Sequence, residues 1–512
     1  MTRLRVGASG TRVAHGPARW LLVAHGALVV VSVQAQHVTL ESTVSVTSTA
    51  THRSGSPGGG SSDSAADEVV AQISPGVIAN VRGGNLQGSL SYSANAMAYV
   101  NDSHNNRISH SLASSGRYSI LGGRAGFDAS ASASEQLISA YGAQGSGDTG
   151  GRANRAQTFA YSLGSFSSGQ LLGQTTYQAR LGYSASRAGS TSVGSTESLN
   201  GSAGLNGRLG LVGWALSGST QVSDSELQDR TRSSSVFGTL SYSPDVEVQL
   251  SARYGREYQD VRTGQIQSSA TWGISASWIP GPRTSVSADY DRRYFGDSYS
   301  VAFSHRMANS IWTFSDSRSV QSTPTAGRFD VSAYDLFFAQ LASLEPDPAK
   351  RDQLVRAFLA ARGIDPNGRV VIGGFLTSLA SVQRRQQFTV AYQGLRYTAV
   401  ASLTNGNTRS AVEGATGNDD LANNNVVRQR GLSLTVSYRI AASSSLSFDA
   451  SVQRTLGTVT QSGNEVRSLG GSWSTQLNTR TSATVGVRYT NFDADAASHN
   501  ESSIFGTLGL RF

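Results

Sequence analysis

Hydrophobic and polar residues alternate one for one along most of this chain. Over residues 270–278 the sequence reads Ala-Thr-Trp-Gly-Ile-Ser-Ala-Ser-Trp, and residues 246–254, 432–440 and 485–489 repeat the pattern. A period of two is that of a β-strand with one apolar and one polar face. A strand that crosses a membrane at a tilt needs about 9–11 such residues. The pattern predicts membrane strands, although the strands of a soluble β-solenoid or sandwich could also alternate.

The alternating segments number about 22. They lie near residues 38–52, 68–82, 85–101, 107–121, 122–138, 158–170, 174–188, 194–207, 208–224, 231–243, 245–259, 265–280, 283–295, 297–306, 310–321, 378–393, 394–410, 428–440, 443–457, 465–479, 481–493 and 501–512. One missed hairpin would change the count by two. We therefore expect an all-β fold with about 22 strands, in a range of 18–24.

Every second connection between these segments is short. The short ones are Gly83-Gly84, Gly122-Gly123, Asn206-Gly207, Pro244-Asp245, Pro280-Gly281-Pro282, Ala308-Asn309, Gln393-Gly394 and Asn478-Thr479-Arg480. The intervening connections are mostly longer and polar, as in residues 53–67, 139–157, 411–427 and 494–500. Short turns on one side and long loops on the other are typical of an outer-membrane barrel. The sequence thus predicts a transmembrane antiparallel up-and-down β-barrel with both ends in the periplasm of a Gram-negative bacterium.

The last twelve residues are the most informative single strand. Ile504, Leu508, Leu510 and Phe512 fall on one face, and the chain stops on that aromatic residue. An exposed apolar strand at a free sheet edge promotes aggregation, whereas a closed barrel pairs its last strand with its first. We interpret these four residues as a terminal insertion signal for the barrel-assembly machinery, with outer-membrane lipid as the surrounding partner.

The first 35 residues have the composition of a signal peptide. Four arginines precede an apolar run from Trp20 to Val33. Val33-Gln34-Ala35 then places small residues at the positions that a signal peptidase reads. A membrane anchor is the alternative, but the run is shorter than the ~20 residues that a spanning helix needs. We therefore expect a signal peptide at 1–35 and the barrel at 36–512.

Composition narrows the possible functions. The chain has no cysteine, 15% charged residues and 38% hydrophobic residues, which is dilute for a soluble protein of 512 residues. The net charge is +8, but the basic residues are scattered singly, so we do not expect nucleic-acid binding. The eight histidines are dispersed, and no zinc-protease, serine-hydrolase or phosphate-loop motif is present. We expect no enzyme activity and no cofactor.

One connection departs from the strand pattern. In residues 322–377, Tyr334, Phe337, Phe338 and Leu341 have the spacing of one helix face. After Pro346-Asp347-Pro348, a second apolar stripe includes Leu354 and Phe358 and ends before Gly363. This predicts a helical-hairpin insertion on the extracellular side of the barrel. It would either plug the lumen or cap the barrel mouth.

The same region carries a family resemblance. Residues 334–348, Leu354-Val-Arg-Ala-Phe-Leu359, Gly374-Phe-Leu-Thr377 and Gln383-Arg-Arg-Gln386 resemble the outer-membrane β-barrel proteins of the PEP-CTERM/exosortase system. Residues 99–103 and 106–110 are also similar to that family. The resemblance implies an outer-membrane location and an exopolysaccharide or exosortase gene setting. It implies no catalytic residues.

Two groups of charged residues are candidate sites. We expect Glu247, Arg253, Asp289, Asp291, Arg439 and Arg488 to line the pore. Asp289 and Asp291 share a strand face and could form a paired-carboxylate site, but the nearby arginines favour ion pairing in the lumen. The loop Asn418-Asp419-Asp420, with Glu413, has too few carboxylates for a calcium site, so we interpret it as a solvated loop without a metal.

Three functions are compatible with these features. The first is a conduit or accessory pore that exports exopolysaccharide or other surface components, with the polymer or its export proteins as partners. The second is a general diffusion porin, although 16–18 strands would suit that role better. The third is a structural or assembly protein of the outer membrane that transports nothing.

Overall fold

The protein is described by a computed structural model. It describes residues 37–56, 67–101, 103–144, 154–171, 173–190, 194–226, 228–260, 266–321, 337–338, 351, 355, 374–377, 379–412, 419–494 and 497–512. Among these residues no helix is long and apolar enough to cross a membrane. The predicted signal peptide lies outside the described residues and stays a prediction.

In the part of the chain that the structure describes, twenty-two antiparallel strands form the fold, the number that the alternating segments predict. They are β1 (His37–Ser56), β2 (Glu68–Arg82), β3 (Leu86–Tyr99), β4 (Arg107–Ile120), β5 (Ala125–Leu137), β6 (Arg155–Gln170), β7 (Thr176–Ala188), β8 (Thr196–Leu209), β9 (Val212–Ser225), β10 (Gln228–Tyr242), β11 (Val248–Gln259), β12 (Gln267–Gly281), β13 (Thr284–Arg293), β14 (Gly296–Arg306), β15 (Ser310–Gln321), β16 (Ser381–Gln393), β17 (Tyr397–Ser410), β18 (Val426–Ala441), β19 (Ser444–Thr455), β20 (Asn464–Gln476), β21 (Thr481–Ala494) and β22 (Ala497–Arg511). Short 3₁₀ turns η2 (Ser103–Asn105) and η3 (Leu121–Gly123) and the helix α3 (Asp420–Asn424) lie between strands.

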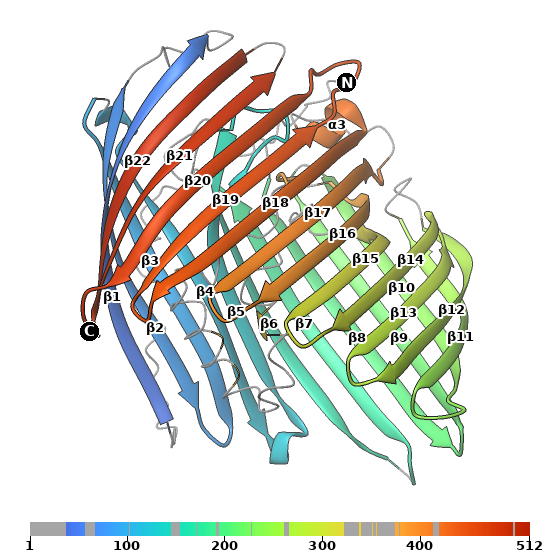
Figure 1. Cartoon of the computed structure of the whole chain (residues 1–512). Helices are drawn as coiled ribbons and strands as arrows, with labels where there is room; N and C mark the ends of the chain where they lie inside the picture. Colours follow the sequence, from blue (N-terminus) through green and yellow to red (C-terminus); the bar gives the residue numbers. More distant parts are fainter. Residues whose placement is uncertain are drawn as a thin grey trace, which may run out of the picture.

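The sheet closes on itself into a barrel (Figure 1). Each strand pairs with the next along the chain, and β1 pairs with β22 from Thr43↔Arg511 to Ser56↔Ser498. At this closure the Thr47 and Thr507 hydroxyls lie 2.9 Å apart, and the Phe512 amide donates to the Ser42 carbonyl at 2.9 Å. The closed antiparallel up-and-down barrel that the sequence predicts is confirmed.

The two faces of the wall differ as the alternation predicts. Trp272, Ile274 and Val487 point outward, and they are 47%, 57% and 57% exposed. Their neighbours along each strand point inward and are mostly polar. Inward residues on adjacent strands form polar contacts, such as those of Ser184 with Ser198 and Ser219 with Ser235. The barrel therefore has an apolar outer surface and a polar lumen.

The two rims also differ. Tight turns follow every even-numbered strand up to β20, and we call that edge the turn rim; the other edge, which carries α3 and most of the longer connections, is the loop rim (Figure 1). The long loop predicted at 494–500 is wrong, because β21 ends at Ala494 and β22 begins at Ala497, and the β13–β14 connection on this rim is equally short. One predicted turn is wrong. Asn206-Gly207 lies within β8, and the chain reverses at Gly210-Leu211 instead. Gly210 has φ +61°, a left-handed conformation that glycine adopts without steric cost, and this decides the turn's position.

The predicted helical hairpin is not confirmed. Within 322–377 the structure describes Phe337, Phe338, Arg351, Val355 and residues 374–377. The first four have helical backbone, and the Arg351 guanidinium lies 4.5 Å from the centre of the Phe338 ring. The remaining residues proposed for the plug or lid, Tyr334, Leu341, Leu354 and Phe358, lie outside the described residues.

Candidate functional site: a crosspiece over the lumen

Three segments of the loop rim meet across the barrel. They are residues 137–144 after β5, residues 374–380 before β16, and residues 419–425 around α3. In a ring of 22 strands β16 is the eleventh strand after β5, so these two strands stand on opposite sides. Yet the Leu376 amide donates to the Leu137 carbonyl at 2.9 Å. We call the three segments together the crosspiece, because they join opposite walls.

Two neighbouring carboxylates hold the crosspiece together. Asp420 accepts hydrogen bonds from the Ser139 hydroxyl at 2.8 Å and the Ala140 amide at 2.7 Å. Asp419 accepts from the Thr377 hydroxyl at 2.5 Å and caps α3 by accepting from the Leu421 amide at 2.9 Å. Each aspartate thus ties the α3 segment to a different partner segment. Bonds to a charged acceptor are stronger than those between neutral groups.

Apolar contacts close the same junction. Ala140, Phe375, Leu379, Leu421 and Val427 form one buried cluster, to which all three segments contribute. The Ala140 carbonyl also accepts from the Thr455 hydroxyl at 3.1 Å and the Asn464 amide nitrogen at 3.0 Å, which anchors the cluster to β19 and β20. Apolar side chains that project from loops into a water-filled lumen would not become this buried. The crosspiece is therefore packed protein.

The sequence analysis interpreted Asn418-Asp419-Asp420 as a solvated loop, and this was wrong for both aspartates. Asp419 is 4% exposed and Asp420 is 6% exposed. Burial raises the pKa of the Asp420 carboxyl above its ordinary value, and the hydrogen bonds from Ala140 and Ser139 oppose that rise. Burial and the Asp420 charge raise the pKa of nearby Tyr141 to about 12. Glu413 lies outside the described residues.

Burial of inward-facing residues changes along the lumen. On β8, Thr196 and Ser198 near the loop rim are 4% and 5% exposed, whereas Asn200, Ser202 and Asn206 towards the turn rim are exposed. On β4, Ser109 is 6% exposed, and Ser111 and Ser115 nearer the turn rim are exposed. Along these strands the lumen is filled at the loop rim and open to solvent at the turn rim.

On the opposite wall, at β17, inward residues are buried from the turn rim to the loop rim. Six successive inward residues of β17 are buried; they are Thr398, Val400, Ser402, Thr404, Gly406 and Thr408. Phe337 and Val355, in the connection between β15 and β16, are 0% exposed. The space inside the barrel is thus unevenly filled, and the open part runs along β4 and β8.

Arginine pairs with acid in the lumen, as the sequence predicts. Arg253 forms an ion pair with Asp291 and lies 3.9 Å from Asp289. The Arg488 guanidinium lies 5.7 Å from the centre of the inward Phe505 ring. Arg439 donates to the Leu395 carbonyl at 3.1 Å, at the turn rim. Glu247 is exposed in the turn before β11, where its amide donates to Asp245.

The sequence analysis did not identify several inward ion pairs. Glu501 is 1% exposed and pairs with Arg53 at 2.5 Å, across the β1–β22 closure. Glu257 is 1% exposed and pairs with Arg293 at 2.5 Å. Both acids lie on the inward row of strands whose outward row is apolar. The sequence signal for these pairs was an inward acid one or two strands away from an inward arginine.

The four residues of the proposed terminal signal lie on the outer face of β22 and at its end. Ile504, Leu508, Leu510 and Phe512 are 55%, 45%, 36% and 68% exposed. Their recognition by assembly machinery stays a prediction. Among the described residues, no group of three or more histidines and acids could hold a metal ion.

A closed barrel with an apolar outer surface and a polar lumen is a protein of the bacterial outer membrane, because it leaves no backbone group unpaired in lipid. The turn rim then faces the periplasm and the loop rim faces the exterior. A scan of protein-family models and a search of curated protein sequences found no match.

Solved structures with a similar barrel include two siderophore receptors and an iron transporter. The siderophore receptor PirA from Pseudomonas aeruginosa is 10% identical, with a TM-score of 0.44, over 92% of this chain and 80% of that one. The FrpB iron transporter from Neisseria meningitidis is 9% identical, with a TM-score of 0.48, over 92% and 81%. The siderophore receptor PiuA from Acinetobacter baumannii is 7% identical, with a TM-score of 0.45, over 92% and 82%. At these identities and scores the likeness carries no inference about a ligand.

Proposed function

We propose that this protein is an outer-membrane conduit that exports exopolysaccharide or another surface component, without enzyme activity of its own. Its exit is closed at rest by the crosspiece and the insertion. The PEP-CTERM/exosortase setting implied by the sequence resemblance is part of this proposal. The observation that carries it is the change in burial along the lumen, from exposed inward residues at the periplasmic rim to buried ones at the extracellular rim.

The lumen suits a hydroxyl-rich polymer. The exposed inward positions of β8 carry Asn200, Ser202 and Asn206, whose amides and hydroxyls both donate and accept hydrogen bonds. Two lumenal arginines are neutralised by acids, Arg180 by Asp128 and Arg253 by Asp291. A neutral, hydrogen-bonding surface can release a sugar chain as readily as it binds it.

The insertion is proposed as the movable part of the closure. Phe337 and Val355 are fully buried, and Gly374–Thr377 at its end enter the crosspiece. Barrels of 22 strands have a lumen wide enough to need a plug. In this proposal the part of the insertion that carries Phe337 and Val355 obstructs the lumen at rest and withdraws when the polymer passes.

Conductance tests the conduit directly. Residues 330–365 would be replaced by a short Gly/Ser linker and the protein incorporated into planar bilayers. The deletion should raise single-channel conductance and make cells sensitive to large antibiotics. Shortening the extracellular loop 260–266, which lies outside the crosspiece, is the matched control and should change neither. A deletion variant that assembles and stays as closed as the parent would contradict the proposal.

Export and passive diffusion are separated in cells. A strain that lacks this protein should lose surface polymer and keep its uptake of small solutes. Unchanged surface polymer with slower solute uptake would instead favour a general diffusion porin. If neither changes and the deletion variant does not conduct, the protein serves a structural or assembly role.

A further inference from the structure

Three outward-facing arginines lie side by side at the extracellular edge of the apolar surface. On β18, Arg430 is the next outward residue beyond Leu432, and on β19, Arg454 is the next beyond Val452. On β20, Arg467 is the next beyond Leu469. All three arginines are exposed. Because the outward apolar band ends at these arginines, we place them at the level where the hydrocarbon of the outer leaflet gives way to its charged headgroups.

This arrangement is unfavourable for the protein alone. Arg430 and Arg454 are direct cross-strand partners on the same face, where like charges repel. Glu465 on β20 lies directly opposite Arg454 and pairs with Arg467 at 2.5 Å, and the exposed outward Asp493 lies opposite Glu465 on β21, so three arginines face two acids. In the part of the chain that the structure describes, no carboxylate pairs with Arg430 or Arg454. The arginine cluster, defined as Arg430, Arg454 and Arg467, therefore carries an excess of positive charge towards the membrane.

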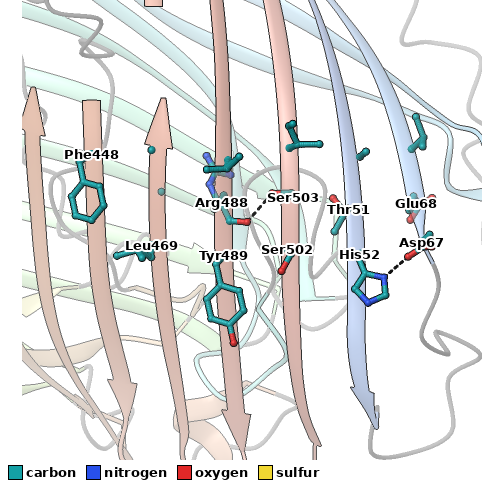
Figure 2. Close-up of a pocket in the computed structure, with 16 residues that line it drawn as sticks. Thr51, His52, Asp67, Glu68, Phe448, Leu469, Arg488, Tyr489, Ser502 and Ser503 are labelled. Atoms are coloured by element: carbon teal, nitrogen blue, oxygen red, sulfur yellow. Dashed lines mark hydrogen bonds and ion pairs between the residues drawn. The ribbon is translucent and has the colours of Figure 1, made fainter. Parts of the chain in front are cut away.

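An apolar hollow lies beside and below the cluster. It has a volume of about 740 Å³ and is lined by β19 to β22 with β1 and β2 (Figure 2). Its outward side chains include Phe448, Leu469, Val487 and Ile504. Gly471 follows Leu469 on the outward row, and a Cβ added there would meet no atom within 4 Å. The hollow therefore continues the outward row of β20 below Arg467.

We propose that the arginine cluster and the hollow form a binding site for a phosphorylated glycolipid of the outer leaflet. The three guanidinium groups bind its phosphates, and one acyl chain lies in the hollow against Phe448 and Leu469. Guanidinium groups form paired hydrogen bonds with phosphate oxygens. A bound phosphate also relieves the repulsion between Arg430 and Arg454, which explains why two like charges face each other there.

The test measures binding of bis-phosphorylated lipid A to the detergent-solubilised protein by native mass spectrometry. The parent should bind with a saturable affinity. Replacing all three arginines by alanine should weaken binding by about 100-fold, since each basic residue near an anionic lipid surface contributes a few-fold to binding. Replacing Arg384, an outward arginine that pairs with Asp316 at 2.9 Å, should leave the affinity unchanged.

Two further binding measurements distinguish binding of the acyl chain in the hollow from binding of phosphate alone. Gly471→Leu should fill the hollow and weaken lipid A binding, whereas Gly116→Leu on β4, equally open at its Cβ, should have no effect. Inorganic phosphate should compete poorly, because it has no acyl chain. Equal affinity of the triple variant and the parent would overturn the proposal, as would full competition by inorganic phosphate.

A folding control keeps the result interpretable. Without lipid A, the Arg430→Ala variant should unfold in detergent at the same or a higher temperature than the parent, because it removes the like-charge contact with Arg454 and its other cross-strand neighbour is the uncharged Asn405. If the variant unfolds at a lower temperature, the cluster serves stability of the wall and the glycolipid site is wrong.

Discussion

Strands β8 and β17 carry similar inward rows but differ in what surrounds them. Both rows consist mainly of small residues such as serine, threonine and glycine, with two asparagines and a terminal Arg208 on β8 and one valine on β17. On β17 every inward residue is buried, from Thr398 near the periplasmic rim to Thr408 near the extracellular rim. On β8 burial stops after Ser198, and Ser202 is exposed. Side-chain chemistry therefore does not decide burial here.

The position of each strand relative to the crosspiece decides whether its inward residues are buried. The crosspiece joins β5 to β16 at the extracellular rim, and β17 lies beside the wall from which the insertion starts. The remaining space borders β4 and β8 and opens towards the periplasm. The difference shows that the lumen is filled beside one wall and open to solvent beside the other.

The substitution with the largest expected effect tests which residues face lipid. The comparison of β8 with β17 depends on this assignment of inward and outward residues. Ile274→Arg should impair assembly by roughly 2–4 kcal/mol, because it places a charge in the hydrocarbon layer. Arg439→Ala should cost less than about 1 kcal/mol, since its side chain lies at the rim and bonds one carbonyl. Heat-modifiable migration on gels measures the folded fraction of each. Equal tolerance would reverse the assignment of the two faces.

Alternation and turn spacing were sufficient to predict most of this fold. Strand number, closure, direction and the two faces follow from a period of two, because one face must meet lipid and the other water. The turn after β8 was misplaced because Asn-Gly is a strong turn signal and the sequence does not show which of two nearby glycines takes the left-handed conformation.

The site was harder to predict than the wall. Asp419 and Asp420 occur in a polar loop, and their burial depends on Ser139 and Thr377, which are distant in sequence. Local pattern carries no information about such contacts between loops. The pairing of Arg253 with Asp291 was predictable, because both lie on inward rows of strands only two apart.

Destabilising the crosspiece should make the inward residues of β8 and β17 more similar in their exposure to solvent. Asp420→Ala removes the acceptor for Ser139 and Ala140 and should destabilise the junction by roughly 1–3 kcal/mol, because a buried donor loses its partner. Channel openings should become more frequent in planar bilayers. Asp224→Ala, at an exposed carboxylate of β9, is the matched control. The role of Asp420 is wrong if both variants gate like the parent.

Lowering the pH should change the frequency of channel openings less than Asp420→Ala does, and in the opposite direction. Because burial raises the folded pKa of Asp420, its contribution to stability is complete below the ordinary aspartate pKa of about 4 and is lost as pH rises through the folded value. Lowering the pH from neutrality towards that range should therefore reduce the frequency of openings. Asp420→Asn should show a weaker pH dependence than the parent. A parent channel that opens more often at acidic pH would contradict this assignment.

Thiol accessibility tests the uneven closure of the lumen most directly. The chain has no cysteine, so Ser202→Cys on β8 and Ser402→Cys on β17 each introduce a single thiol. A small charged thiol reagent, added from the periplasmic side of the reconstituted barrel, should modify Cys at 202 on the order of tenfold faster or more, since the thiol at 402 reacts only after local opening. Deleting 330–365 should bring the two rates together. Equal rates in the intact protein would contradict a lumen that is filled along β17 and open along β8.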